Sequence, residues 1–184
     1  MLRTLAVSPV EQGLLYAFLA LGVYLSFRVL GFPDLTVQGS FPLGAAVAAR
    51  LIADGRSPLL ATLSALIAGG LAGAATGVLH TRLKINNVIA SILTMTAAYS
   101  VTLRVMGRAN QPLLNSPTVF GLVLKPLSLP EDSLTIIGLA AIVVVAGSVL
   151  FNAFLHTELG LAIRATGDNE HMMRAFGAST DDVK

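Results

Sequence analysis

The residue types that carry out catalysis are sparse in this sequence, and their positions argue against an enzyme. Its three histidines, His80, His156 and His171, lie at or beyond the ends of the apolar stretches. An intramembrane enzyme needs paired acids, a metal site or an activated serine at membrane depth, and no histidine here is placed to take part in one. The chain has no cysteine, which excludes thiolate chemistry and cysteine-ligated metals. We therefore expect no enzyme activity, no metal and no cofactor.

One ionisable residue does lie where a functional site is expected. Asp34 precedes a polar run that contains glycine and proline, Thr36-Val37-Gln38-Gly39-Ser40-Phe41-Pro42. Irregular backbone at membrane depth is tolerated only where protein or water surrounds it, and an ionisable residue there indicates a functional site. The alternative is an interfacial turn in which Asp34 or Thr36 caps the following helix.

The composition places the chain in a membrane. Of its 184 residues 54% are hydrophobic and only 12% are charged, and the mean hydropathy is +0.77. A soluble domain carries about 25% charged residues, so this chain has too little charge to cover a soluble surface. The net charge of +2 comes from scattered lysines and arginines rather than a basic stripe, so we expect no nucleic-acid partner.

The apolar stretches predict an all-α, polytopic transmembrane helix bundle. A helix needs about 20 mostly apolar residues to cross a bilayer. Four spans are expected, at about 12–31, 57–80, 85–104 and 133–155. A fifth segment, 35–53, is shorter and opens with the polar run, which predicts a broken or re-entrant second helix. Residues 1–155 would then form the transmembrane domain, and 156–184 a polar tail outside the hydrocarbon.

Basic residues at the ends of the spans predict the orientation. The turn Thr81-Arg82-Leu83-Lys84 is the clearest cytoplasmic candidate, and the tail that follows two spans later is then cytoplasmic too. The proline-rich loop 104–132, which can hold a short lateral helix, falls outside. If the 35–53 segment crosses fully, the N-terminus is outside; if the segment only dips into the membrane, the N-terminus is inside.

Small residues recur at every fourth position of the 57–80 span. They are Ala61, Ala65, Gly69, Gly73 and Gly77. Glycine lets another backbone approach closely, so we expect Gly69, Gly73 and Gly77 to pack against another helix. That helix belongs either to the same subunit or to a second one.

The tail predicts two short capped helices. Thr157 can cap a first helix that stops at Gly167, and Asp168 can cap a second that ends at Gly177. Met172, Met173, Ala175 and Phe176 give the second helix an apolar face. A helix of two turns is not stable alone in water, so this one has to pack on another surface.

These segments together resemble the permeases of ABC importers of the branched-chain amino acid and ribose type. The similarity extends over essentially the whole chain and is closest to a branch with a single permease gene per system. Its most specific parts are Phe32-Pro33-Asp34-Leu35-Thr36-Val37-Gln38-Gly39-Ser40-Phe41 and Thr157-x-x-Gly160-x-x-Ile163-Arg164-Ala165-x-Gly167-x-Asn169.

The resemblance implies roles for both motifs. In such permeases the first is a discontinuous helix near the translocation path, which Asp34, Thr36, Gln38, Gly39 and Ser40 would line here. The second lies in a cytoplasmic loop whose coupling helix docks on the ATPase subunit. That helix would run from about Asn169 to Phe176. The coupling residues would be Gly167, Asp168, Asn169, Met172, Met173, Arg174, Phe176 and Gly177.

The resemblance also implies a function and partners. The chain would be a permease subunit of the bacterial inner membrane that forms the path for a small solute, an amino acid or a related molecule. The ATP-binding subunit must be a separate chain, because the G-x-x-x-x-G-K-[ST] phosphate loop is absent. A periplasmic or lipid-anchored substrate-binding protein and a second permease copy, giving a homodimer, would complete the system in the lipid bilayer.

Two further expectations concern the limits of this resemblance. Members of the family continue with several more spans after the coupling loop, so we expect the chain to be a fragment or a truncated product. The alternative function is an ion-coupled secondary transporter, which also uses broken helices and a lone acid. The capped tail with its methionines disfavours that alternative, because it has the features of a docking element.

Overall fold

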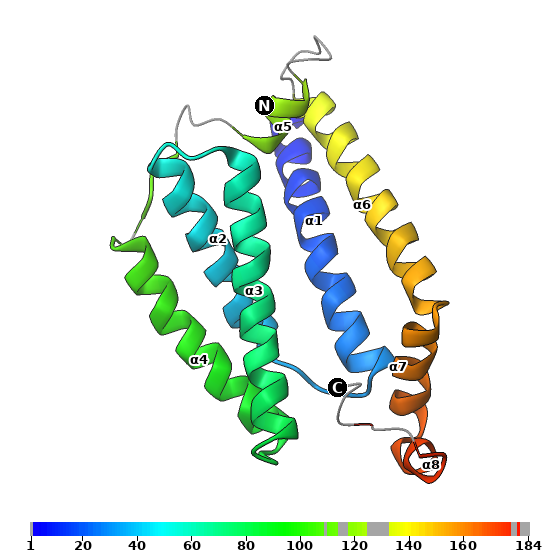
Figure 1. Ribbon diagram of the computed structural model, residues 1–184. Coiled ribbons are helices and arrows are strands. Elements are labelled where there is room, and N and C mark those ends of the chain that lie inside the picture. The colour runs from blue at the N-terminus through cyan, green and yellow to red at the C-terminus, as the bar shows by residue number, and fades with distance from the viewer. Residues whose placement is uncertain (1, 109, 114–117, 125–132, 178–179, 181–184) are drawn as a thin grey trace. The chain divides into compact units, whose positions relative to one another are not determined.

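The regular elements of the computed structural model are all helices (Figure 1). It describes residues 2–108, 110–113, 118–124, 133–177 and 180. Four of the helices are long and apolar enough to cross a membrane: Val7–Val29, Pro58–Thr81, Asn87–Met106 and Leu134–Leu155. The predicted all-α class with several apolar helices is confirmed.

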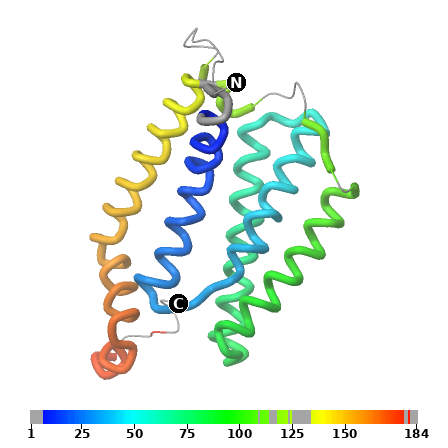
Figure 2. Tube along the Cα trace, turned by 180° about the vertical axis from the view of Figure 1, so that it is seen from behind, coloured from blue at the N-terminus to red at the C-terminus, as the bar shows by residue number. Residues whose placement is uncertain are grey.

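The chain divides into two compact units. One contains Met1–Phe32 and Leu124–Lys184, and the other contains Pro33–Val123. Figure 2 traces the same chain from the opposite side. Each unit is described by itself below.

Three long helices lie in the unit of residues 33–123: α2 (Val37–Ala53), α3 (Pro58–Thr81) and α4 (Asn87–Met106). Helix α2 packs against both α3 and α4. The interfaces are built from small side chains, and Ala46, Ala61, Ala90 and Ser91 are at most 1% exposed. Small residues let helix backbones approach closely, and this packing replaces the hydrophobic drive that lipid does not provide.

The break that the sequence predicted within the second helix lies before the helix instead. Residues 30–36 are not helical, whereas Val37–Ala53 is one continuous α-helix with Pro42 inside it. The polar run 36–42 therefore provides the first turns of α2 rather than interrupting it. Tertiary packing outweighs helix propensity in proteins, and the buried Gly39 of this run packs directly on α4.

Local caps explain where α3 and α4 begin. The Ser57 hydroxyl accepts a hydrogen bond from the Leu60 amide at 3.4 Å, and Pro58 occupies the first turn, where its missing N–H costs nothing. The Asn86 side chain accepts one from the Val88 amide at 3.0 Å. The turn 82–86 between the two helices is closed by the His80 ring, whose Nδ1 lies 2.9 Å from the Ile85 carbonyl oxygen.

The other unit contains α1 (Leu2–Tyr24), the π-helix η1 (Leu25–Val29), α6 (Ser133–Leu155), α7 (Glu158–Asp168) and α8 (Glu170–Ala175). Helices α1 and α6 lie side by side (Figures 1 and 2). The short helix α5 (Val119–Leu124), in the proline-rich loop, belongs to the unit of residues 33–123 except for Leu124.

Helix α1 begins ten residues before the predicted start of the first span, at Leu2 instead of 12. The prediction followed the charge-free stretch, and Glu11 lies just before it. Hydropathy marks only the part of a helix that hydrocarbon can surround. The helix itself extends past that boundary, here through Pro9 and Glu11.

The glycine stripe of α3 is only partly a packing surface. Ala61 is fully buried. A Cβ built on Gly44 of α2 would lie 3.3 Å from the Ala65 carbonyl oxygen, and a Cβ built on Gly69 would lie 3.9 Å from the Ser40 carbonyl oxygen. At Gly73, however, no atom of the described chain lies within 4 Å of a Cβ position. A spacing of four residues rotates by about 40° per step on a helix of 3.6 residues per turn. The buried face therefore continues through Ala72 and Thr76 instead.

Candidate functional site

Hydrogen bonds hold the segment that leads into α2 in place. The Asp34 carboxylate accepts a hydrogen bond from the Thr36 amide at 2.8 Å. The Thr36 hydroxyl lies 2.6 Å from that of Thr76 on α3, and both threonines are 1% exposed. Of the two caps that the sequence left open, the Thr36 side chain makes no capping hydrogen bond, and the Asp34 carboxylate bonds the amide of Thr36, the residue directly before α2.

The five predicted path residues therefore have different environments. Thr36 and Gly39 are buried between helices, and a Cβ on Gly39 would lie 2.8 Å from both Cα and the carbonyl oxygen of Met95. Asp34 and Ser40 are half-buried, and Gln38 is exposed. Within this unit, Thr36 and Gly39 pack between helices, whereas Asp34, Gln38 and Ser40 keep part of their surface exposed.

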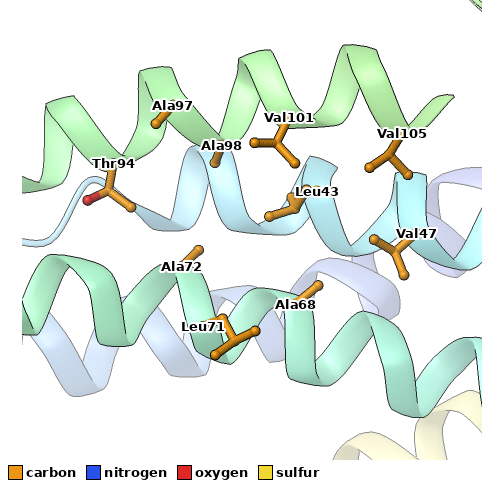
Figure 3. Close-up of a pocket in the computed structure, with 10 residues that line it drawn as sticks. All are labelled: Leu43, Val47, Ala68, Leu71, Ala72, Thr94, Ala97, Ala98, Val101 and Val105. Carbon is orange, nitrogen blue, oxygen red and sulfur yellow. The ribbon is translucent and has the colours of Figure 1, made fainter. Parts of the chain in front are cut away.

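An apolar cavity of about 350 Å³ lies between the three helices of this unit (Figure 3). Its ten lining residues are uncharged and come from all three helices: Leu43, Val47, Ala68, Leu71, Ala72, Thr94, Ala97, Ala98, Val101 and Val105. Thr94 is the one polar side chain among them, and its hydroxyl donates to the Ala90 carbonyl of its own helix at 3.1 Å. The cavity can therefore accept an apolar group but offers almost no polar recognition.

The tail forms the two predicted short helices, with one cap displaced. Thr157 caps α7 as predicted, and its hydroxyl accepts from the Gly160 amide at 3.3 Å. Helix α7 continues through Asp168, so Asn169 and not Asp168 caps α8, accepting from the Met172 amide at 3.0 Å. Asn169 has the extended backbone that a cap requires, with φ −156° and ψ 94°. Gly177 follows α8 with φ +81°, the left-handed conformation expected after a helix.

Helix α8 exposes apolar side chains. Phe176 is 78% exposed and Met172 is 50% exposed, whereas Met173 is half-buried. Of the four residues of the predicted apolar face, Met172, Ala175 and Phe176, which directly follows the helix, are exposed, and Met173 is half-buried. A continuous exposed apolar face on a short helix is typical of a surface that binds a partner.

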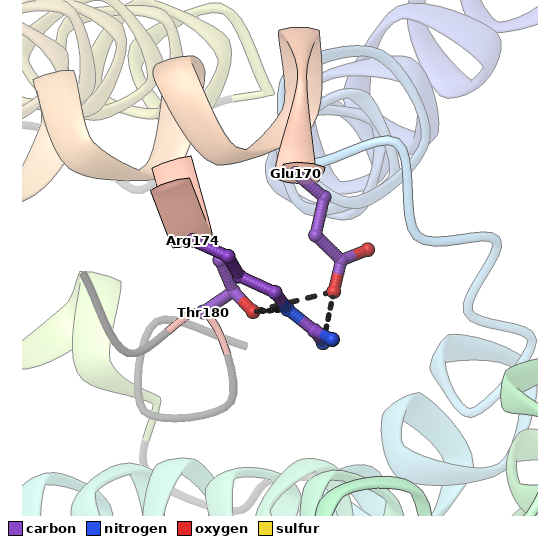
Figure 4. A network of polar contacts seen from close by, with 3 residues as sticks. All are labelled: Glu170, Arg174 and Thr180. Carbon is purple, nitrogen blue, oxygen red and sulfur yellow. Dashed lines mark hydrogen bonds and ion pairs between the residues drawn. The ribbon is translucent and has the colours of Figure 1, made fainter. Parts of the chain in front are cut away.

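A polar network holds the far side of α8 (Figure 4). The Arg174 guanidinium donates from Nη2 to Glu170 Oε1 at 2.6 Å and from Nε to the Thr180 hydroxyl at 2.8 Å. Thr180 in turn lies 3.3 Å from Glu170 Oε1 and is 2% exposed. Arg174 thus connects α8 to the segment that follows it. The predicted helix cap at 179–182 lies outside the described residues, apart from Thr180.

Two glycines of the tail motif lie at close backbone contacts. A Cβ on Gly160 would collide with the Phe154 carbonyl oxygen, at the bend between α6 and α7. A Cβ on Gly167 would collide with the Val29 carbonyl oxygen and lie 2.9 Å from the Leu30 carbonyl carbon. Gly167 therefore joins α7 to η1, a contact that the sequence did not predict. π-helical turns are frequent at functional sites.

Comparison of the sequence with known proteins assigns the chain to a family. Residues 6–184 match the branched-chain amino acid transport system permease component family. The chain belongs to this family. The family is described as a permease component of a transport system, not an enzyme by itself, and with several apolar helices it implies a multi-pass protein of the bacterial inner membrane.

Individual relatives support the same assignment. A tyrosine transport system permease protein of Clostridioides difficile (strain R20291) is 35% identical over 97% of this chain and 57% of that protein. An uncharacterized protein of Rickettsia prowazekii (strain Madrid E) is 36% identical over 93% of this chain and 58% of its own length.

The ribose import permease protein RbsC of Escherichia coli (strain K12) is 29% identical over 95% of this chain and 53% of that protein. The chain thus spans a little over half the length of these curated relatives. No solved structure matches it significantly.

Proposed function

We propose that this permease chain forms part of the translocation path of an ATP-driven importer. The proposal rests on the tail of this chain, which forms two capped helices, α7 and α8. Met172 on α8 and Phe176 directly after it are exposed. A helix of that length needs a partner surface to be stable. The partner that fits is a groove on a separate ATP-binding subunit, with α8 as the coupling helix.

The contact at Gly167 gives this coupling helix a route to the membrane. Gly167 lies in the last turn of α7, shortly before α8 begins. It packs on the backbone of Val29 and Leu30. The non-helical segment 30–36 follows directly and leads to Asp34 and α2. Movement of α8 by the ATP-binding subunit would therefore act on Val29 and Leu30, from which the chain continues to the start of α2.

We propose an amino acid or a related small molecule as the solute. The relatives carry the names of a tyrosine and a ribose transport system, so the names alone allow either class. The cavity between α2, α3 and α4 has an apolar lining with Thr94 as its one polar residue. Such a lining suits an apolar side chain better than a sugar, whose many hydroxyls need hydrogen-bond partners.

The remaining partners follow from the same proposal. A periplasmic or lipid-anchored substrate-binding protein would deliver the solute, and a second permease copy would complete the path as a homodimer. The face of α3 that carries Gly70 and Gly73 has no neighbour within the described chain. It is therefore available to a second copy as well as to lipid.

Uptake measurements test this function. Cells that lack their own tyrosine uptake would express the permease with its ATP-binding subunit and binding protein, and would be given labelled tyrosine, leucine or ribose. We expect accumulation of an amino acid and no accumulation with an ATP-binding subunit that cannot hydrolyse ATP. Accumulation of ribose alone would contradict the solute class. Uptake that persists without ATP hydrolysis would support the ion-coupled alternative.

A further inference from the structure

A polar cavity of about 420 Å³ lies within the unit that contains α1, where the end of that helix and η1 face α7. It is lined by Tyr24, Arg28, Val29, Arg164 and Asp168. The cavity is open to the surface: Val29 is buried, whereas Tyr24, Arg28, Arg164 and Asp168 are exposed. Asp168 is also one of the predicted coupling residues, but no role proposed above uses Tyr24, Arg28 or Arg164.

The cavity carries an excess of positive charge. Two guanidinium groups, from Arg28 on η1 and Arg164 on α7, and the single carboxylate of Asp168 give it a formal charge of +1. Neither guanidinium is within 4.0 Å of a carboxylate in the part of the chain that the structure describes. Guanidinium groups bind phosphate oxygens through two parallel hydrogen bonds. Two unpaired arginines in one cavity therefore indicate a phosphate-bearing ligand.

The two walls of the cavity are held together by the backbone. Gly167, three residues after Arg164, packs on the carbonyl of Val29, the residue next to Arg28. Val29 is 8% exposed, and the neighbouring Thr166 is 3% exposed, with its hydroxyl donating to the Ala162 carbonyl at 2.8 Å. The Cα positions of the two arginines are thus fixed by a rigid junction. A ligand between them does not have to order a flexible loop.

The position of the cavity at the end of α1 indicates which kind of molecule carries the phosphate group. The candidate membrane span Val7–Val29 ends at this cavity, and Arg28 is the first charged residue after its apolar stretch. Tyr24, 49% exposed, lies one turn earlier. Tyrosine and arginine at the end of a span lie at the level of lipid headgroups, and basic pockets at that level bind anionic headgroups.

We propose that this cavity binds the headgroup of an anionic glycerophospholipid. Arg28 and Arg164 would bind the phosphodiester, and Asp168 would accept a hydrogen bond from a headgroup hydroxyl. The net charge of +1 favours a headgroup of charge −1 over a zwitterionic one. This site rests on the membrane location of the permease and does not depend on the solute that it transports.

Lipid titration of the purified chain in detergent tests the proposal. The probes are short-chain phosphatidylglycerol, phosphatidylethanolamine and phosphatidylcholine, and water-soluble sn-glycerol 3-phosphate. Binding would be followed by thermal shift and by native mass spectrometry. We expect phosphatidylglycerol to bind best. Arg28→Gln and Arg164→Gln should each weaken it roughly fivefold, whereas Arg104→Gln, an exposed arginine at the end of α4, should not.

The variants also guard against a loss of folding. Asp168→Asn removes the opposing charge but keeps a side-chain oxygen that can accept the hydrogen bond of the headgroup hydroxyl, so it should bind phosphatidylglycerol at least as tightly as the natural chain. Unchanged affinity in the Arg28→Gln/Arg164→Gln double variant would overturn the site. Equal binding of glycerol 3-phosphate would show that the ligand is a free phosphate ester and not a lipid. Preference for phosphatidylethanolamine would overturn the anionic assignment.

Discussion

Gly39 and Gly73 are the same residue type in opposite environments, and substitution at each tests the packing. A Cβ on Gly39 would lie 2.8 Å from backbone atoms of Met95, which cannot move aside like a side chain. Gly39→Ala should lower the free energy of unfolding by about 1–3 kcal/mol. Gly73→Ala meets nothing within 4 Å, so it should be neutral or stabilise by up to about 1 kcal/mol through helix propensity.

Thermal unfolding of the purified chain in detergent compares the two variants directly. A loss at Gly73 as large as that at Gly39 would contradict the arrangement within one chain. That result would mean that a further surface, such as that of a second permease copy, covers this face of α3. Measuring the oligomeric state of the Gly73→Leu variant would then distinguish that cause from local misfolding.

For single residues, the sequence predicted which ones take part in close packing better than it predicted what they contact. A stripe of small residues in an apolar span indicates close packing, and α3 does pack closely at Ala61 and Ala65. The sequence does not say which arc of the helix is covered, because that depends on the partner helices. The Thr36–Thr76 hydroxyl pair joins residues that are 40 positions apart. No local pattern predicts such a contact.

The junction between α7 and η1 is the contact between elements on which the proposed coupling depends. Gly167→Ala would place a methyl group against the Val29 carbonyl oxygen, so it should force α7 away from η1. In the cysteine-free chain, a cysteine placed at Val29, which is 8% exposed, would report this opening. We expect its labelling by a thiol reagent to become several-fold faster in the Gly167→Ala background.

A glycine without neighbours provides the control for this experiment. Gly138→Ala on α6 adds a methyl group where nothing lies within 4 Å. It should leave the labelling of a cysteine at position 29 unchanged. If Gly167→Ala also leaves the labelling and the melting temperature unchanged, α7 does not pack on η1, and the proposed route from the coupling helix to the start of α2 is wrong.

The ends of the helices show where nearby residues alone are sufficient to predict the structure. Thr157 and Gly177 were predicted at the two ends of the tail helices and lie there, because a hydroxyl cap and a left-handed glycine depend on nearby backbone only. Between Asp168 and Asn169 the prediction chose the wrong cap, since both residue types cap well. The helical polar run 36–42 was also missed, because packing on α3 and α4 decides its conformation.

The path of the whole chain through the membrane gives a separate prediction. The turn at 82–86 and the tail from 156 onward should be cytoplasmic, and the loop around residue 110 should be external, because α4 and α6 each cross once. Single cysteines at Leu83, Asn110 and His171 occupy exposed positions. In intact cells an impermeant reagent should label only position 110. Labelling at 171 but not at 110 would invert the proposed orientation.

The central claim for the whole molecule is that α8 docks on an ATP-binding subunit. Met172→Glu and Phe176→Glu each place a carboxylate on the exposed apolar face of α8. Burying it in an apolar groove without a partner costs several kcal/mol, and each 1.4 kcal/mol or so weakens binding tenfold. His171→Glu is the matched control, because His171 is exposed on the same short helix and is not part of the apolar face. Arg174 is unsuitable as a control, since it holds Glu170 and Thr180.

Co-purification of the ATP-binding subunit with the permease tests this claim most directly. The natural chain and His171→Glu should retain the subunit, whereas Met172→Glu and Phe176→Glu should lose it. All four should reach the membrane in equal amounts and melt at the same temperature, because positions 172 and 176 are exposed in the isolated chain. Normal retention of the ATP-binding subunit by both glutamate variants would contradict the account. Loss of stability in the isolated permease would instead mean that α8 packs on its own chain.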